Sequence, residues 1–306
     1  MVFLIIALIL AAICLLLSWF LYRFCFYSPM KNQNSLQNLP MEEQYAPYRE
    51  RMRQEIKEAA GLPWEDVSIT AFDGVKLMGR YLESTPGAPL AIFFHGYRSN
   101  AFRDGFGAIR IARDRGMNVL VIDQRAHGAS GSHTITFGVK ERQDCLSWVR
   151  YAERRFGKNT EIVIMGVSMG AATVLMATEL ALPGSLKAVV SDCPYANVKD
   201  IMVKTGRDMG LPRQLYPLIR LGAFLFGGFD PSKGDAARAV RAAKVPILII
   251  HGEDDRFVPQ EMSAQVAEAN PAIRRVTIPN AAHANSYLED TAKYTEIVNT
   301  FLNEVL

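Results

Sequence analysis

Short apolar segments recur along most of the chain, separated by stretches of helical length and mixed polarity. Each apolar segment is nearly continuous rather than alternating, which is typical of strands buried on both faces of a sheet. Their alternation with helical stretches predicts parallel strands joined by crossover helices. The segments are residues 90–94, 118–122, 161–165, 187–191, 246–250 and 274–278.

Two alternating segments precede this pattern, on either side of Asp73-Gly74, a dipeptide that favours a tight turn between antiparallel strands. We therefore predict one α/β domain over residues 62–306, with a mostly parallel central sheet, helices on both faces and a hairpin at its start. The interval between the fourth and fifth apolar segments is longer than one crossover helix needs. Its surplus, about residues 195–232, predicts a small helical cap inserted in the domain.

The N-terminus is uniformly apolar, with no charged residue between Val2 and Tyr22. About twenty helical residues, rising about 1.5 Å each, span a hydrocarbon core of about 30 Å. A cleaved signal peptide is the alternative, but no basic residue precedes the run and no small-residue cleavage site follows it. We expect residues 1–27 to be an uncleaved single-pass transmembrane helix in the cell membrane. Arg23 and Lys31 follow the span, so the positive-inside rule places the larger part of the chain in the cytoplasm.

Residues 28–61 are expected to form a polar linker and then an amphipathic helix, in which Tyr48, Met52 and Ile56 recur at intervals of four. Because this connection separates the anchor from the domain, we expect that deleting residues 1–27 leaves a soluble, active domain.

The balance of charge and the cysteines exclude several functions. The net charge is only +3, and basic residues do not cluster as nucleic-acid binding requires. The four cysteines form no CxxC motif and no Cys/His pair, so neither a metal site nor a disulfide framework is expected. Between Lys199 and Arg220, in the cap, five basic residues outnumber two acidic ones. This segment is either an ordinary solvated helix face, the simpler interpretation, or a contact for lipid headgroups.

One serine lies at a strand–helix junction. Ser168 follows the apolar segment 161–165, with Gly166 and Gly170 two positions away on either side. A sharp turn here needs glycine at both positions, because side chains would collide with the neighbouring strand and helix. The turn would present the hydroxyl beyond the carboxyl end of its strand, where open parallel sheets bind ligands. A helix N-cap serine is the alternative explanation of the same pattern.

A serine hydroxyl becomes nucleophilic only beside a base, and the base needs an orienting acid. His283 follows the last apolar segment by five residues and precedes the last helical stretch. Glu253, Asp254 and Asp255 follow the segment before it. The residues alone therefore predict the order serine, acid, histidine, and they leave the acid open, with Asp192 as a further candidate beyond another strand.

Four segments together resemble those of the α/β-hydrolase superfamily, namely FFHGYRSN at 93–100, DQRAHGASGS at 123–132, GVSMG at 166–170, and HGEDDRFVP at 251–259 followed by AAHA. The resemblance covers nearly all of residues 65–306 and suggests a membrane-anchored esterase, acyl-thioesterase or serine-aminopeptidase-like branch. It implies the α/β-hydrolase fold and a triad of Ser168 as nucleophile, Asp255 as acid and His283 as base. It implies neither a cofactor nor a metal.

The same resemblance implies an oxyanion hole made of backbone N–H groups, those of Tyr97 and Met169. His95 is expected to hold its loop, and His127 belongs to a loop that braces the site. Many relatives have glycine where Asn280 stands here, and asparagine tolerates left-handed backbone better than most residues.

These groups imply attack on an acyl carbonyl, an acyl-enzyme intermediate and its hydrolysis by water. We therefore expect a serine hydrolase of esterase type acting on a small-molecule acyl ester, with an apolar cap that favours acyl or aryl groups. A thioesterase or a serine aminopeptidase would use the same triad. A membrane-tethered binding module without catalysis is the alternative from another class.

Overall fold

The computed structural model describes residues 1–29, 39 and 43–306, so most of the expected polar linker lies outside the described residues. The strands are β1 (Glu65–Thr70), β2 (Lys76–Leu82), β3 (Leu90–Phe94), β4 (Asn118–Asp123), β5 (Ile162–Val167), β6 (Leu186–Asp192), β7 (Ile247–Gly252) and β8 (Arg274–Ile278). The α-helices are α1 (Val2–Cys25), α2 (Arg49–Ala60), α3 (Ala101–Asp114), α4 (Glu141–Phe156), α5 (Met169–Ala177), α6 (Val198–Asp208), α7 (Tyr216–Gly227), α8 (Ala236–Ala239), α9 (Gln260–Glu268), α10 (Ser286–Glu289) and α11 (Thr291–Val305). The 3₁₀ turns are η1 (Glu43–Tyr48), η2 (Arg213–Leu215), η3 (Pro231–Lys233) and η4 (Val240–Ala242).

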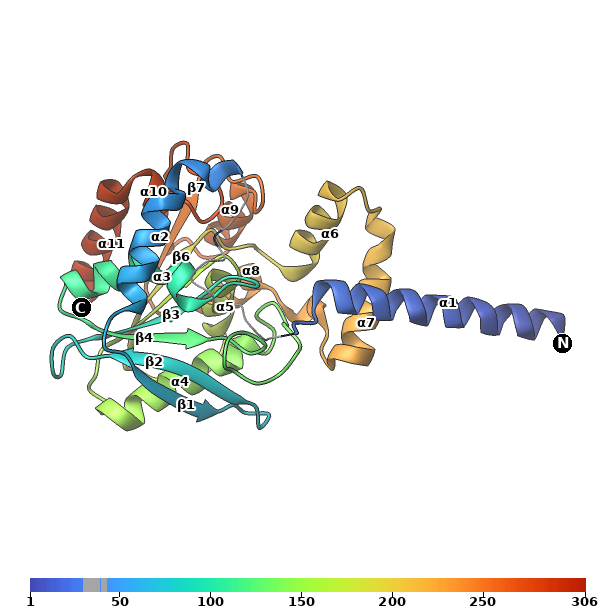
Figure 1. Ribbon diagram of the computed structural model, residues 1–306, viewed down its shortest axis with the longest axis horizontal. Coiled ribbons are helices and arrows are strands. Elements are labelled where there is room, and N and C mark those ends of the chain that lie inside the picture. The colour runs from blue at the N-terminus through green and yellow to red at the C-terminus, as the bar shows by residue number, and fades with distance from the viewer. Residues whose placement is uncertain (30–38, 40–42) are drawn as a thin grey trace.

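The strands form one sheet in the order β1-β2-β4-β3-β5-β6-β7-β8 (Figure 1). β1 pairs antiparallel with β2, and β2 with β4, whereas all later neighbours are parallel. Gly74 lies in the β1–β2 turn with a φ of 84°, the left-handed conformation that a tight hairpin turn requires. The predicted architecture, a mostly parallel sheet led by a hairpin, is confirmed.

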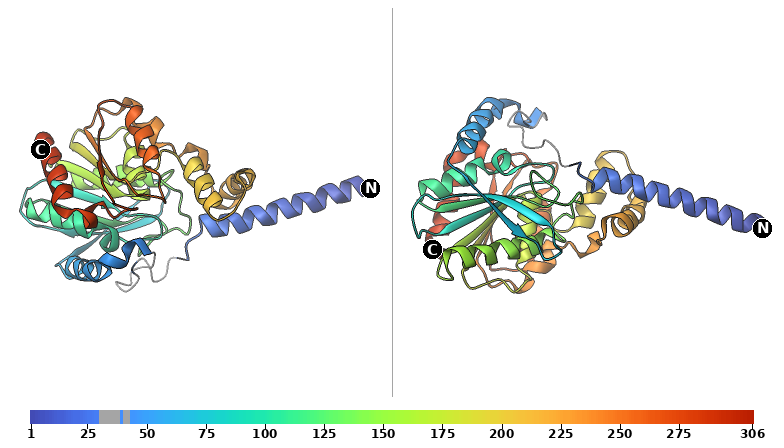
Figure 2. Two further views of the ribbon diagram at one scale, coloured as in Figure 1. Left: turned by 90° about the horizontal axis from the view of Figure 1, so that it is seen from above. Right: turned by 60° about the horizontal axis from the view of Figure 1, so that its bottom comes forward.

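Helices cover both faces of the sheet (Figures 1 and 2). Successive side chains of a strand point to opposite faces, and β3 divides its residues accordingly. Leu90, Ile92 and Phe94 join the core under α4, α5, α8 and α9. Ala91 and Phe93 join the core under α2, α3 and α11. The expected amphipathic helix is α2, which begins after η1 and buries one apolar face in the second core.

The predicted insertion between β6 and β7 contains α6 and α7. The Asn197 side chain caps α6 by accepting a hydrogen bond from the Asp200 N–H. α7 ends at Gly228, whose φ of 63° is the left-handed cap that glycine favours. Both helices lie on the side of the body toward which β4 points, so the insertion faces the carboxyl edge of the sheet (Figure 1).

α1 projects from the body as a long helix, and among the described residues it is the one helix long and apolar enough to cross a bilayer (Figures 1 and 2). Its C-terminal end is nevertheless part of the domain. Leu21, Tyr22 and Phe26 are buried in the core that lies under α4 and α5, and α7 packs along this end. The expectation that residues 1–27 can be deleted without consequence conflicts with this packing.

Candidate active site

A strained turn presents Ser168 at the carboxyl end of β5. The backbone of Ser168 has a φ of 55°, a region that side chains rarely adopt. A Cβ on Gly166 would lie 2.5 Å from the carbonyl carbon of Gly170, and a Cβ on Gly170 would lie 2.0 Å from the carbonyl oxygen of Phe94. Only glycine fits at either position, as the sequence pattern predicts.

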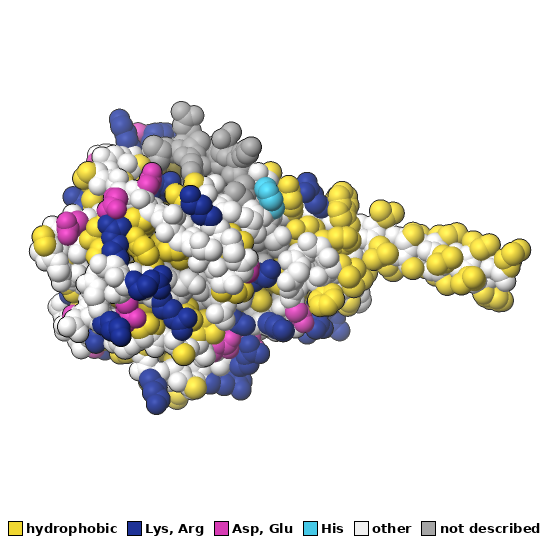
Figure 3. Space-filling model, turned by 90° about the horizontal axis from the view of Figure 1, so that it is seen from below, with side chains coloured by type: hydrophobic (Ala, Val, Ile, Leu, Met, Phe, Trp, Pro, Cys, Tyr) yellow, Lys and Arg dark blue, Asp and Glu magenta, His cyan; other side chains and the backbone are white. Residues whose placement is uncertain are grey.

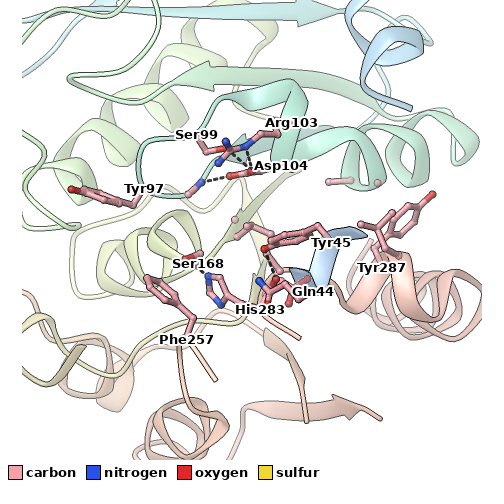
Figure 4. Close-up of a pocket in the computed structure, with 18 of the residues that line it drawn as sticks. Gln44, Tyr45, Tyr97, Ser99, Arg103, Asp104, Ser168, Phe257, His283 and Tyr287 are labelled. Carbon is pink, nitrogen blue, oxygen red and sulfur yellow. Dashed lines mark hydrogen bonds and ion pairs between the residues drawn. The ribbon is translucent and has the colours of Figure 1, made fainter. Parts of the chain in front are cut away.

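A chain of hydrogen bonds connects Ser168 to His283 and Asp255, and Figure 4 shows Ser168 and His283 facing each other in the pocket. The Ser168 Oγ lies 2.9 Å from the His283 Nε2, and the His283 Nδ1 lies 2.7 Å from the Asp255 Oδ2. With Asp255 ionised, the imidazole carries its proton on Nδ1, so Nε2 accepts the hydrogen bond from the serine hydroxyl. The side chains come from the ends of β5, β8 and β7, and the fold brings the three together.

The Asp255 carboxylate is fixed by several donors. Its Oδ1 accepts hydrogen bonds from the N–H groups of Phe257 and Val258, at 2.9 and 2.8 Å. Its Oδ2 also lies 3.2 Å from the His251 Nε2. Burial by itself raises the pKa of Asp255, but attraction to His283 and hydrogen bonds from both histidines outweigh it and bring the pKa below its ordinary value. The carboxylate therefore stays charged and correctly oriented.

The other acids considered from the sequence lie elsewhere. Asp254 is exposed, and Glu253 accepts a hydrogen bond from the Thr277 hydroxyl. Asp192 is buried and lines the same pocket, and it accepts a hydrogen bond from the Ser286 hydroxyl at 3.5 Å, whereas the His283 Nδ1 bonds to Asp255. Burial raises its pKa to about 6. The geometry therefore favours Asp255 as the partner of the histidine.

The loop after β3 lies against Ser168, since a Cβ on Gly96 would be 3.5 Å from the serine Cβ. Asp104 of α3 shapes this loop by accepting hydrogen bonds from the Gly96 N–H and the Ser99 hydroxyl, at 2.7 and 2.5 Å. The Met169 N–H is the first of α5 and has no partner inside the helix. Among the described residues, the Tyr97 N–H has no acceptor. Both N–H groups are thus free to bind an oxyanion.

His95 and His127 brace the same loop. The His127 Nε2 accepts a hydrogen bond from the Arg98 N–H at 3.0 Å, and the His95 Nε2 accepts one from the Gln124 N–H at 3.1 Å. Their Nδ1 atoms donate to backbone carbonyls. Both rings are fully buried, and burial lowers the pKa of both. They are therefore neutral near pH 7 and act as fixed structural acceptors.

The end of α1 is hydrogen-bonded to the loop after β3, a relationship that no sequence pattern indicates. The Tyr97 hydroxyl donates to the Cys25 carbonyl at 2.9 Å. The Arg98 guanidinium donates to the carbonyls of Phe24 and Tyr27, at 2.8 and 3.2 Å. The last carbonyls of a helix lack partners within it, and a cation there is favourable. α1 and the loop after β3 thus support each other.

A pocket of about 590 Å³ opens at Ser168 and His283. Its lining includes apolar and aromatic side chains, among them Met52, Phe93, Phe106, Met165, Val190 and Tyr287. The segment before α2 closes one side, and the Tyr45 hydroxyl donates to the His283 carbonyl at 2.7 Å (Figure 4). Phe257 packs on the His283 ring, with centroids 4.9 Å apart. The pocket suits an apolar group next to a polar reacting centre.

One combination at the site could in principle hold a metal, because ligand atoms of Cys193, Asp255 and His283 lie within 4.8 Å of one another. The carboxylate and the imidazole are already hydrogen-bonded to each other. Burial raises the pKa of the Cys193 thiol well above its usual value, and a protonated thiol is a poor metal ligand. The arrangement fits an acid–base pair better than a metal site.

Comparisons with known proteins agree with this fold. The family model described as "Alpha/beta hydrolase family" matches residues 91–296. The uncharacterized protein YqkD of Bacillus subtilis is 27% identical over 252 residues, which cover 79% of this chain and 82% of YqkD. Protein ABHD12B of Homo sapiens is 25% identical over 193 residues, which cover 60% of this chain and 50% of that protein.

Solved structures of similar fold include two esterases. The esterase Pf2001 of Pyrococcus furiosus superimposes with a TM-score of 0.66 at 25% identity, covering 81% of this chain and 95% of that chain. Est1E of Butyrivibrio proteoclasticus, with ferulic acid bound, has a TM-score of 0.62 at 24% identity, covering 78% of this chain and 98% of that chain. The chain belongs to the alpha/beta hydrolase family.

Proposed function

We propose that this chain is a serine hydrolase that cleaves carboxylic esters through an acyl-enzyme intermediate. The observation that carries the proposal is the continuous hydrogen-bond chain from the Ser168 Oγ through His283 to Asp255. Membership of the alpha/beta hydrolase family supports hydrolysis as the reaction class. The esterases among the proteins of similar fold support an ester as the substrate.

In the proposed reaction, the His283 Nε2 takes the hydroxyl proton as the Ser168 Oγ attacks the acyl carbonyl. The imidazolium that forms keeps its Nδ1–H on the Asp255 carboxylate, which stabilises its charge. The carbonyl oxygen becomes an oxyanion between the N–H groups of Tyr97 and Met169, the proposed oxyanion donors. Loss of one such donor typically costs about 10²–10³-fold in kcat.

Collapse of the tetrahedral intermediate transfers the proton from His283 to the leaving alcohol and leaves the acyl group on Ser168. A water molecule then attacks the acyl carbonyl as His283 accepts its proton, and the second collapse releases the acid and restores the serine hydroxyl. Every proton in this sequence moves through His283, and no step needs a cofactor.

The apolar wall of the pocket supports an acyl or aryl group as the recognised part of the substrate. An acyl-thioesterase or a serine aminopeptidase would use the same groups, because each reaction also attacks an acyl carbonyl. A panel of esters with graded chain lengths, acyl thioesters and aminoacyl amides separates these activities. We expect the highest kcat/KM for an ester.

The proposal includes attachment to the cell membrane through α1, with residues 1–27 as a single-pass anchor. The length and apolar composition of α1 support a span, and a signal sequence is the alternative. Arg23 follows the span directly, which favours a cytoplasmic catalytic domain. Protease added outside intact cells should then leave the domain uncut.

A fluorophosphonate probe tests the central chemistry, because it reacts with activated serine hydroxyls. We expect the full chain in detergent or bilayer to be labelled, and Ser168→Ala to abolish labelling. Ser147→Ala is a matched control, since that hydroxyl lies in α4 and donates to the Gln143 carbonyl of the same helix. A folded wild-type chain that resists the probe would favour a membrane-tethered binding module instead.

A further inference from the structure

The cap helix α7 carries large apolar side chains on a surface that nothing in the described part of the chain covers. Phe224, Leu225 and Phe226 are 65%, 48% and 41% exposed. We infer that α7 lies in the bilayer interface beside α1, so that the chain contacts lipid through a two-helix surface rather than through a single span. This inference rests on the proposed membrane attachment of α1.

The length of the free part of α1 is the first argument. Residues 2–17 are exposed, whereas Ser18, Leu21 and Tyr22 are buried by the body of the protein. At about 1.5 Å per residue, residues 2–17 extend about 24 Å, which falls short of a hydrocarbon core of about 30 Å. If α1 spans the whole hydrocarbon core, that core must therefore also contain the turns of α1 against which α7 packs.

α1 and α7 pack so closely that the surface of a bilayer cannot lie between them. A Cβ on Gly222 would lie 2.2 Å from the carbonyl oxygen of Ser18, so the two backbones touch. Ala223 is fully buried, and the ring of Phe226 lies 6.0 Å from that of Tyr22. Small residues that let helix backbones approach closely are typical of helix pairs in membranes.

The exposed side of α7 extends the apolar surface of α1. Trp19, Phe20 and Phe24, near the end of α1, are 48%, 61% and 46% exposed. Figure 3 shows hydrophobic side chains gathered where α1 leaves the body, with Lys and Arg side chains beside them. Such a patch marks an interaction site, and its continuity with α1 makes lipid the occupant.

Charges next to this surface suit lipid headgroups. Lys199, Arg207 and Arg213 are exposed, and within the described residues none of them forms an ion pair. Arg220, by contrast, is paired with Asp230 at 2.7 Å. An apolar helix face flanked by free basic side chains is the pattern of helices that lie in a membrane interface.

This arrangement also brings the catalytic pocket next to lipid. α6 supplies Lys204 and Asp208 to the pocket lining and leads through η2 directly into α7. The substrate class that follows is an acyl ester dissolved in the bilayer, which could enter the pocket beside α6 without crossing bulk water.

Photo-crosslinking in lipid nanodiscs of phosphatidylcholine and phosphatidylglycerol tests the inference on the full chain. Leu225 is replaced with p-benzoylphenylalanine, with Phe20 of α1 as the positive position and Phe72, 56% exposed beside the β1–β2 turn, as the matched negative position. We expect lipid adducts from positions 20 and 225 and none from position 72. Adducts from position 20 alone, or a crosslink between two copies through position 225, would overturn the inference.

Two parallel readouts separate this inference from the proposed chemistry. Fluorophosphonate labelling of the same nanodisc samples reports on Ser168 whatever the lipid adducts show, and absence of adducts at both 20 and 225 would refute the anchor itself. The variant Phe224→Ser/Leu225→Ser should raise KM for a long-chain ester in vesicles about fivefold or more and leave turnover of a water-soluble ester unchanged. Phe72→Ser should change neither, and an unaltered KM in the double variant would contradict lipid contact by α7.

Discussion

The Tyr97 side chain donates a hydrogen bond to the main-chain carbonyl of Cys25 across 2.9 Å, and so links the loop after β3 to the last turn of α1. The Tyr97 ring also packs on Phe137, with centroids 4.9 Å apart. Since the N–H of the same residue is the proposed oxyanion donor, the position of that donor depends on the end of the apolar helix. α1 thus contributes to the geometry of the site.

Weakening this link should lower turnover. Arg98→Ala removes the bonds to Phe24 and Tyr27, and Tyr97→Phe removes the bond to Cys25 while keeping the ring. Complete loss of an oxyanion donor lowers kcat by about 10²–10³-fold. The double variant only loosens the proposed donor, so we expect its kcat to fall by about tenfold with little change in KM. Steady-state kinetics on a water-soluble p-nitrophenyl ester measure both constants.

The exposed Arg154 serves as the control for this pair, and Arg154→Ala should keep parental kcat. Deletion of residues 1–27 should reproduce the loss in the double variant, because it removes all three carbonyls that the loop contacts. A truncated protein with full kcat on the soluble ester would show that the loop holds its shape without α1.

The identity of the acid can be tested with two neighbouring residues. Asp255→Asn should lower kcat by about 10³–10⁴-fold, because the amide no longer favours the tautomer in which the His283 Nε2 is an acceptor. Asp254→Asn, an equal change at an exposed position one residue earlier, should leave kcat within about twofold. Equal losses in both variants, or a loss confined to position 254, would refute the assignment.

The elbow turn should tolerate no Cβ at position 170. In Gly170→Ala the new carbon would meet the carbonyl oxygen of Phe94 at 2.0 Å, and the contacting atoms of Phe94 and His95 belong to the backbone, which cannot shift easily. We expect destabilisation of about 3 kcal/mol or more, measured by urea unfolding. Gly184→Ala, with no atom within 4 Å of its Cβ, should change stability by less than about 1 kcal/mol.

Acid should destabilise the loop through its buried histidines. The pKa of His127 in the folded chain lies well below the ordinary value of 6.5, because burial disfavours the charged ring. The unfolded chain therefore takes up the proton first, and stability falls as the pH decreases from about 6.5 toward the folded pKa. His127→Gln, which can still accept from the Arg98 N–H, should show a shallower fall in melting temperature between pH 7 and 5.

Asp192 also contributes to the dependence of stability on pH, and its contribution has to be separated from that of His127. Asp192, whose pKa burial raises to about 6, contributes with the opposite sign, since its neutral form is favoured in the folded state and gains stability as the pH falls. That contribution is present in parent and variant, so the difference between their slopes reports on His127. Identical slopes in the parent and in His127→Gln would contradict the assigned role.

Residues that follow buried strands could be placed from the sequence. Ser168, Asp255 and His283 each come shortly after an apolar segment, and parallel strands bring their carboxyl ends to one edge of the sheet. Asn280 adopts a φ of 59°, the left-handed backbone that asparagine tolerates better than most residues. The pattern of apolar residues ends at residue 165, whereas β5 continues through Gly166 to Val167. The pattern could not show this, because pairing with β3 and β6 extends the strand beyond its own propensity.

Contacts between distant segments could not be predicted. Tyr97 and Cys25 are separated by 72 positions, and Tyr45 and His283 by 238, without any local pattern that pairs them. Both contacts join the site to the N-terminal segment, which the sequence presents as an anchor followed by a linker. Hydrophobic periodicity identifies which elements form, whereas the packing of long-range partners depends on shape and on unpaired carbonyls.

The nucleophile is tested most directly by the mass of the protein during turnover. The full chain is mixed with p-nitrophenyl butyrate, quenched in acid within the first turnovers and digested for tandem mass spectrometry. We predict a butyryl group on the peptide that contains Ser168, on the serine oxygen itself, and neither adduct nor turnover in Ser168→Ala. Sustained turnover in that variant, or an acyl group bound to a different side chain of the active wild-type protein, would contradict the account.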